Sequence, residues 1–422
     1  MWATLLSYMI DAANRLTAEA VPAPRRLVSL DAYRGATMLL MASEIMHVPA
    51  TLKKLDSYSQ SPTLQSVVHQ LDHLAWAGCT LWDMIQPSFM FMVGVALPFS
   101  LASRLARGHV FSRMLVHALW RSVLLVALGI FLRSVGRPMT NFTFEDVLTQ
   151  IGLGYPFLFL LGFARPRWQW TAAALILVAY WAAFALYPEP GPEFNYPAVG
   201  VPANWPEHYG GFASHWNKNS NYAAYADQWF LNLFPREKPF QFNRGGYLTL
   251  NFVPSLATMI FGLLAGGLLR SRRTVREKAA ILVVAGLTGL AVGWTLDWLG
   301  VCPMVKRIWT PSWAIYSSGW AAIALAAFFA IIDWAGFRRW AFPLVVVGMN
   351  SIAMYVLVHL SFGFVSGSLT THLNYVSESW FGRPLFEVFG QPYPPIVEGA
   401  MVLAIFWLIS LWLYRRGAFL RI

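Results

Sequence analysis

The stretch HQLDHLAWAGCTLWDMIQPSFMFMVGVALPFS, residues 69–100, decides the fold of this chain. Its second half is apolar over nearly the length of about 20 residues that a helix needs to cross a bilayer. Asp83 nevertheless lies close to where this apolar run begins. A carboxylate at hydrocarbon depth costs roughly 2.5–3.5 kcal/mol even on lenient insertion scales. The stretch therefore predicts a membrane-spanning helix with a polar, functional cavity at its mouth.

The composition extends this interpretation to the whole chain. Its 422 residues are 57% hydrophobic and 12% charged, whereas soluble domains carry about twice that charged fraction. Strands of a membrane barrel would be shorter and would alternate strictly in polarity. We therefore predict an all-α, polytopic membrane helix bundle with about ten transmembrane helices. The expected spans are about 31–48, 80–102, 113–132, 144–163, 168–187, 248–269, 279–299, 312–334, 341–360 and 395–414.

The net charge of +11 reflects membrane topology rather than nucleic-acid binding. The Lys and Arg residues lie at the ends of apolar runs, as in the cluster at 270–278, and do not gather on one soluble domain. The positive-inside rule then places both termini in the cytoplasm. Lys306 and Arg307 fall on the outer side against this trend, which suggests a specific role for them.

The domain organisation is simple. Residues 1–24 lack the features of a cleavable signal and predict a short amphipathic helix on the inner membrane surface. Residues 25–422 form one transmembrane domain, and 188–247 form a large outer loop or lid. This loop is rich in aromatic residues and Asn, which suits either a carbohydrate-facing cap or a lid that packs on the bundle. The spacing Gly262-x3-Gly266 lets membrane helices approach closely.

His73 is the leading candidate for a catalytic residue. An imidazole with a pKa near neutrality can take a proton from an amine or a hydroxyl group. A histidine at a helix mouth is often structural, but the buried Asp83 nearby favours a function. We predict His73 and Asp83 as catalytic residues. Asp72 and Trp76, beside the same histidine, are predicted to bind the acceptor substrate.

Two further groups lie on other helices. Asp31 and Arg34 begin the first span, where they either anchor the helix end or present Arg34 to an anionic ligand from the cytosol. Ser351, Tyr355 and His359 are spaced by four and share one helical stripe. That stripe serves either interhelical hydrogen bonding or, through Tyr355 and His359, the acceptor substrate.

Several chemistries are not supported by the sequence. It contains no P-loop, no GxGxxG, no HExxH and no GxSxG, which argues against a nucleotide-driven motor and the usual serine hydrolases. We expect no metal site, because His69, Asp72 and His73 lie in a predicted loop. Cys79 and Cys302 lack CxxC spacing and are expected as free thiols, with a disulfide left open.

Several sequence blocks resemble the heparan-α-glucosaminide N-acetyltransferase family. They occur in the family's order and cover nearly all of residues 25–360. The blocks are Ser29-Leu-Asp-Ala-Tyr-Arg-Gly35, His73-x-x-Trp76-x-Gly78 with Asp83 and Pro87, Arg121, Lys306-Arg-Ile-Trp309-Thr-x-Ser312, Asp333 and Gly348-Met-Asn-Ser351.

This resemblance implies an acetyl-CoA-dependent transmembrane N- or O-acetyltransferase. Such an enzyme uses acetyl-CoA from the cytosol and delivers the acetyl group to an amino sugar or glycan hydroxyl on the outer side. His73 matches the family's active histidine and would act as general base or transient acyl carrier. Asp83 matches a carboxylate beside the acceptor.

The resemblance also implies further residues and a location. Lys306 and Asn350 match polar positions that line the cavity, and both are expected to bind acetyl-CoA. Arg34 and Arg121 become candidate partners of the CoA phosphates. The chain resembles a bacterial-type relative, so we expect a multi-pass protein of a bacterial inner membrane. Its partners would be acetyl-CoA, a carbohydrate acceptor and the lipid bilayer, with self-association left open and nucleic acid excluded.

The alternative hypothesis is a transporter or flippase for a sugar or a lipid-linked glycan. Asp83, Asp297, Asp333 and His359 would then mark a translocation path or proton relay. Against it, the sequence has no inverted repeat and no pair of matching broken helices.

Overall fold

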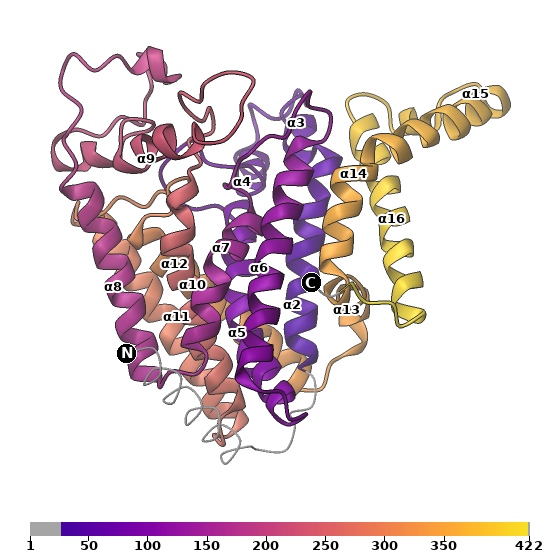
Figure 1. Ribbon diagram of the computed structural model, residues 1–422. Coiled ribbons are helices and arrows are strands. Elements are labelled where there is room, and N and C mark those ends of the chain that lie inside the picture. Colours follow the sequence, from indigo (N-terminus) through magenta and orange to yellow (C-terminus); the bar gives the residue numbers. More distant parts are fainter. Residues whose placement is uncertain (1–26, 421–422) are drawn as a thin grey trace.

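The computed structural model describes residues 27–420, and in this range the chain is helical, with no strands (Figure 1). Within residues 27–420, eight helices are long and apolar enough to cross a membrane. The prediction of an all-α, polytopic membrane protein is therefore confirmed. The amphipathic helix expected at 1–24 lies outside the described residues.

The bundle and its connections consist of fifteen α-helices joined by short 3₁₀ and π turns, among them η2 (Trp82–Met84) before α5. The bundle helices are α2 (Val28–Ala42), α5 (Ile85–Leu105), α6 (Phe111–Ser134), α7 (Val147–Leu161), α8 (Pro166–Ala185), α10 (Phe252–Arg270), α11 (Val275–Trp298), α12 (Pro311–Phe328), α13 (Phe342–Met349), α14 (Ser351–Leu369) and α16 (Pro394–Arg415). The helices outside it are α3 (Val48–Leu52), α4 (Pro62–Gln70), α9 (Tyr222–Leu231) and α15 (Tyr375–Phe381).

The ten predicted spans map onto these helices with two differences. First, the helices α2 and α7, expected at 31–48 and 144–163, have only 15 residues each. They are therefore shorter than the other eight helices, which are long enough to cross a membrane. The ninth span, expected as one helix over 341–360, is interrupted at Asn350, whose φ of −127° and ψ of 36° are not helical. Its second part continues as one helical segment as far as Phe381.

Glycines bring α5 and α10 into close contact, as the Gly262-x3-Gly266 spacing predicts. A Cβ atom on Gly262 would lie 2.0 Å from the Phe91 carbonyl oxygen, and one on Gly266 would lie 2.4 Å from that of Val95. Only glycine allows these backbones to approach so closely. As a result α5 lies at the centre of the bundle, and its segment Phe89–Met92 is buried throughout.

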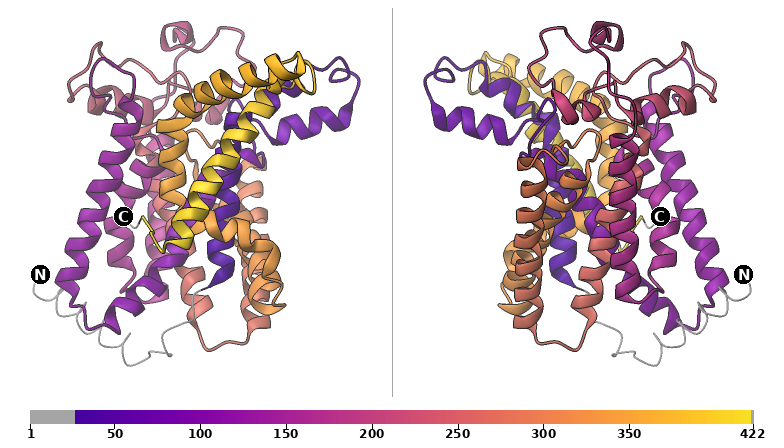
Figure 2. Two further views of the ribbon diagram at one scale, coloured as in Figure 1. Left: turned by 90° about the vertical axis from the view of Figure 1, so that its right-hand side faces the viewer. Right: turned by 90° about the vertical axis from the view of Figure 1, so that its left-hand side faces the viewer.

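The two ends of the bundle differ in character (Figure 2). We call one the cap end, since it carries α9 and the long connecting segments 43–81, 186–248 and 299–310. The opposite, basic end has the short turns 106–110, 162–165, 271–274 and 335–341, and α2 begins and α16 ends toward it. This alternation agrees with the predicted topology, in which the basic end faces the cytoplasm.

The cap segment 186–248 is held by buried asparagines. The Asn219 side chain donates hydrogen bonds to the carbonyl oxygens of Val199 and Asn243, at 2.9 and 3.0 Å. Trp216 is fully buried beneath the cap, whereas the side chain of Trp229 is 67% exposed. The buried Trp216 therefore fits a lid that packs on the bundle. Exposed aromatic residues such as Trp229 fit the alternative of a cap that faces a carbohydrate.

Candidate active site

Two segments far apart in the sequence are joined at the cap end. The loop between α4 and η2 lies against the segment 299–310 through a bridge between Ala77 and Val305. The Gly78 N–H donates to the Met304 carbonyl oxygen at 2.9 Å. Gly78 has a φ of 101°, a conformation that glycine adopts without strain. This junction places Lys306 beside the residues that the sequence singled out.

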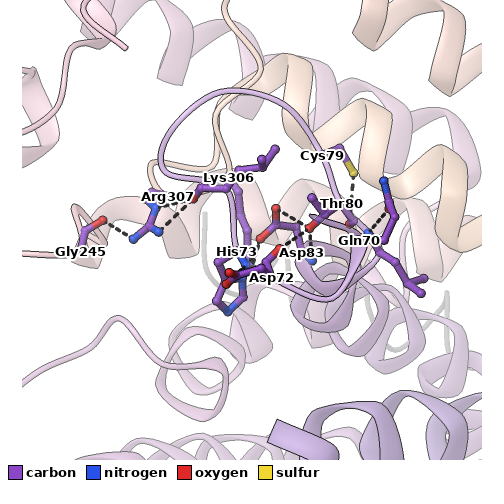
Figure 3. A network of polar contacts seen from close by, with 11 residues as sticks. Gln70, Asp72, His73, Cys79, Thr80, Asp83, Gly245, Lys306 and Arg307 are labelled. Atoms are coloured by element: carbon purple, nitrogen blue, oxygen red, sulfur yellow. Dashed lines mark hydrogen bonds and ion pairs between the residues drawn. The ribbon is translucent and has the colours of Figure 1, made fainter. Parts of the chain in front are cut away.

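His73, Asp83 and Lys306 form one polar cluster (Figure 3). His73 Nδ1 lies 2.8 Å from Asp83 Oδ1, and Lys306 Nζ lies 3.0 Å from the same oxygen. Lys306 Nζ is also 3.2 Å from His73 Nδ1. The side chains of Asp83 and Lys306 are only 3% and 7% exposed, whereas that of His73 is 38% exposed. The histidine is therefore the member of the cluster that a substrate can reach.

The contacts select one tautomer of His73. An ionised carboxylate only accepts hydrogen bonds, so His73 Nδ1 carries the proton and donates it to Asp83 Oδ1. In the neutral ring the lone pair then resides on Nε2, the nitrogen that does not contact Asp83. Thr80 supports the arrangement, since its hydroxyl donates to Asp83 Oδ2 at 3.0 Å. A buried carboxylate held by Lys306 and Thr80 is stable in a place where an unpaired charge would be costly.

Asp72 and Trp76 have structural partners next to this cluster. Asp72 pairs with Lys53 at 2.6 Å and accepts the His73 backbone N–H at 2.9 Å. Partial burial alone would raise the pKa of Asp72, but the hydrogen bond and charge of Lys53 outweigh it and lower that pKa. Trp76 is buried and donates its indole N–H to the Trp216 carbonyl oxygen at 3.2 Å. Acceptor binding by Asp72 and Trp76 stays a prediction.

Arg307 clamps the loop that carries His73. Its Nε and Nη2 donate to the Leu74 carbonyl oxygen at 3.2 and 2.9 Å, and its Nη1 donates to that of Gly245 at 2.7 Å (Figure 3). Its guanidinium also lies 5.0 Å from the centre of the Tyr247 ring. From the sequence, Arg307 was expected to have a specific role because it lies on the outer side against the charge trend, but it was not predicted as a site residue.

A second site opens at the basic end, as a cavity of about 460 Å³ lined by α2, α5, α6, α7, α13 and α14. Arg34 and Arg121, which the sequence predicted as partners of CoA, both line it. Arg104 and His117 join them and were not predicted. Arg104 lies on α5 and His117 on α6. Their side chains are in contact, with 3.1 Å between Arg104 Nη2 and His117 Nε2. Three arginines and a histidine thus line one cavity.

Arg121 is held against Tyr155 by two contacts. Its Nη1 donates to the Tyr155 hydroxyl at 3.1 Å, and its guanidinium stacks 4.5 Å from the centre of the Tyr155 ring. Its Nε is buried without a hydrogen-bond partner among residues 27–420. A buried donor without an acceptor is unfavourable.

The remaining predicted residues lie away from His73. Tyr355 lines the cavity at the basic end, and His359 stacks on it with ring centres 4.2 Å apart. The amide of Asn350 donates to the Ala418 carbonyl oxygen at 3.1 Å and accepts the Leu420 N–H at 3.0 Å. Tyr355 thus lines the same cavity as Arg34 and Arg121, and Asn350 braces the C-terminal segment. Acceptor binding by Tyr355 and His359 stays a prediction.

Other polar groups are accounted for locally. Asp297 accepts the Met304 N–H at 2.8 Å and Asp333 accepts the Ser29 N–H at 3.2 Å, at opposite ends of the bundle. Cys79 and Cys302 are free thiols, as the sequence predicted. Burial, aided by the charge of Asp83, raises the pKa of Cys79 to about 12. In the described part of the chain, no three His, Cys, Asp or Glu residues gather as metal ligands.

Comparison with known proteins identifies two relatives with the same name. The chain is 24% identical over 374 residues to heparan-alpha-glucosaminide N-acetyltransferase of Homo sapiens, a match that covers 79% of this chain and 52% of the relative. It is also 24% identical over 322 residues to the Mus musculus protein of that name, covering 67% of this chain and 48% of the relative. The chain spans about half the length of the curated relatives it matches. No protein-family model matches it. The two matches support a family-level relationship between this chain and the heparan-alpha-glucosaminide N-acetyltransferases.

Proposed function

We propose that this chain is a membrane acetyltransferase that moves an acetyl group from acetyl-CoA to an amino sugar or glycan hydroxyl. The N-acetyltransferase relatives support a transferase in general terms. The single observation that carries the finer assignment is the pairing of His73 with the buried Asp83 at 2.8 Å. This pairing leaves an accessible imidazole nitrogen with its lone pair free, which is what a general base requires.

The donor would bind in the cavity at the basic end. Acetyl-CoA supplies a thioester, whose carbonyl carbon is open to attack by a nucleophile, together with several phosphate charges. Arg34, Arg104 and Arg121 would hold those phosphates, and the orphaned Nε of Arg121 supplies a donor group that the protein itself leaves unused. The positive charge of these three arginines and their position around one cavity fit the phosphates of acetyl-CoA.

The residues at the cap end can perform the proton transfers. As the acceptor amine or hydroxyl attacks the acetyl carbonyl, His73 Nε2 would take its proton, and the imidazolium would then give that proton to the leaving sulfur as the C–S bond breaks. Asp83 holds the ring and stabilises the imidazolium that forms. One of the three N–H groups of the Lys306 ammonium donates to Asp83. The other two would stabilise the negative charge that develops on the carbonyl oxygen during the reaction. A second route, in which Nε2 first accepts the acetyl group itself, uses the same residues.

Helix α5 connects the two sites. Asp83 lies just before its first turn, and Phe89 lines the donor cavity. With a rise of 1.5 Å per residue, these positions are about 10 Å apart along the helix. A donor entering from the basic end would therefore need to extend only a short way to present its acetyl group to His73. Under the positive-inside rule, this corresponds to a donor from the cytosol and an acceptor from the outer side.

The test is acetyl-CoA turnover by the purified chain in nanodiscs, with and without a panel of amino sugars and glycans. We expect CoA release that depends on the acceptor and is lost in His73→Ala, while thermal-shift measurements show that the variant is folded. Turnover retained in a folded His73→Ala would remove the histidine from the mechanism. No CoA binding and no turnover with any acceptor would refute the transferase assignment, and counterflow of labelled sugar in proteoliposomes would then test transport.

A further inference from the structure

A long groove runs along α10 and α11 on a face that the proposed reaction does not use. It consists of two adjoining cavities of about 950 and 520 Å³. Trp170, Leu264, Leu268 and Ile281 line both of them, so the two are continuous. None of the residues that line the donor cavity lines either part. We call the larger cavity, at the basic end, the head cavity and the smaller one the tail cavity.

The head cavity is cationic. Arg270, Arg272 and Arg273 line it where α10 turns into α11. Arg270 is partly buried and donates one hydrogen bond, from Nη1 to the Pro98 carbonyl oxygen at 3.1 Å. The nearby carboxylate of Glu277 caps its own helix by accepting from the N–H and hydroxyl groups of Thr274, at 2.7 and 2.9 Å. None of the three arginines forms an ion pair within residues 27–420.

The tail cavity is apolar. On α11 it is lined by Ile281, Ala285, Thr288 and Val292, which lie on one stripe of the helix. The adjoining face of α11 packs against α12 through Gly286, whereas Ala285, Thr288 and Val292 on the groove side are exposed among residues 27–420. Trp170 and Phe261, with ring centres 5.6 Å apart, close the other wall.

We propose that this groove binds an anionic phospholipid. Its phosphate would lie among the three arginines, and one acyl chain would extend along the tail cavity. A cationic pocket joined end to end with a hydrocarbon-lined groove matches the two parts of such a molecule, and basic pockets between membrane helices on the cytoplasmic side are typical sites for anionic headgroups. A zwitterionic choline lipid would bring a cation of its own toward three guanidinium groups, so it should bind less well.

The first experiment compares three additives on the detergent-purified chain. Apparent Tm is measured with phosphatidylglycerol, phosphatidylcholine or soluble glycerol phosphate at equal concentration. A ligand that binds the folded state alone raises the apparent Tm in a concentration-dependent way. We expect a clear, saturable rise with phosphatidylglycerol and little with the other two. An equal rise with phosphatidylcholine, or with glycerol phosphate, would overturn the proposal in favour of a general lipid effect or a free-anion site.

Two pairs of variants locate the effect. Arg272→Gln with Arg273→Gln removes two charges from the head cavity, and the control Arg107→Gln with Arg276→Gln removes two exposed charges from the same end outside it. Ala285→Trp fills the tail cavity without changing charge, and Val284→Trp, on the adjacent exposed position, is its control. Both groove variants should lose most of the rise in Tm and both controls should keep it. Retention of the rise in the groove variants would refute the site, whatever the outcome of the turnover assay.

Discussion

Lys306 Nζ lies 3.0 Å from Asp83 Oδ1, although 223 residues separate them in the sequence. Both side chains are nearly inaccessible, so each charge depends on the other. Removing one partner of a buried pair typically costs about 3–5 kcal/mol, because it leaves an uncompensated charge. Lys306→Met should therefore lower the apparent Tm strongly, whereas Lys54→Met, at an exposed lysine of the cap end, should leave it unchanged.

The same pair separates stability from activity. Lys306→Met combined with Asp83→Asn removes both charges and should recover part of the lost Tm. It should not recover turnover, because His73 would still lack its carboxylate. A double variant as unstable as the lysine variant alone would contradict this account of the pair.

Asp83→Asn alone tests how His73 is oriented. An asparagine preserves the shape of the side chain but offers no negative charge to stabilise the imidazolium. If His73 is the general base, kcat should fall by roughly 10²–10⁴. Because the two residues act as one unit, adding His73→Ala to Asp83→Asn should cost little more. Fully additive losses, measured by CoA release, would show that they act independently.

Arg121→Gln tests the donor cavity. Loss of a charged hydrogen-bond donor is worth about 1.5–3 kcal/mol, which corresponds to a rise in KM for acetyl-CoA of roughly 10- to 100-fold. The acceptor KM should not change. Arg113→Gln, on the exposed side of the same helix, is the matched control. An unchanged donor KM, or an equal effect in the control, would place the CoA phosphates elsewhere.

The approach of α5 to α10 should be sensitive to a single methyl group. Gly262→Ala would place a Cβ 2.0 Å from the Phe91 carbonyl oxygen, so the two helices must separate. Gly267→Ala, on the same helix, meets nothing within 4 Å and should be neutral or slightly stabilising. Thermal-shift measurements on both variants decide the point, and equal Tm values would argue against the packing described for α5.

Asp227 in α9 gives the cap a pH dependence. Burial raises the pKa of this carboxyl from an ordinary 3.8 to about 7, although it accepts the Thr249 N–H. The folded state thus holds its proton more tightly than the unfolded state does. Stability from this group is complete below pH about 4 and declines as the pH rises through about 7. Each unit of difference in pKa is worth about 1.4 kcal/mol. Asp227→Asn should flatten the decline in Tm between pH 5 and 8, and parallel curves for the two proteins would contradict this.

Sequence reasoning found the spans because hydrocarbon thickness imposes a length that composition reveals. It also found His73 and Asp83, since a carboxylate in an apolar run is conspicuous. It did not find the roles of Arg307, Arg104 and His117, which depend on segments that meet only in the folded chain. The assignment of Tyr355 to the acceptor stays a prediction. The break at Asn350 was not predicted, because one asparagine leaves little trace in an apolar run.

The buried run Phe89–Met92 has a consequence for how the two sites are placed relative to each other. It follows Asp83 along α5, and Phe89 also lines the cationic cavity. Its side chains leave little accessible surface, and Gly262 of α10 packs against the Phe91 carbonyl oxygen. Such close packing leaves α5 little freedom to shift. The spacing between Asp83 and the cavity wall is therefore preorganised before any ligand binds.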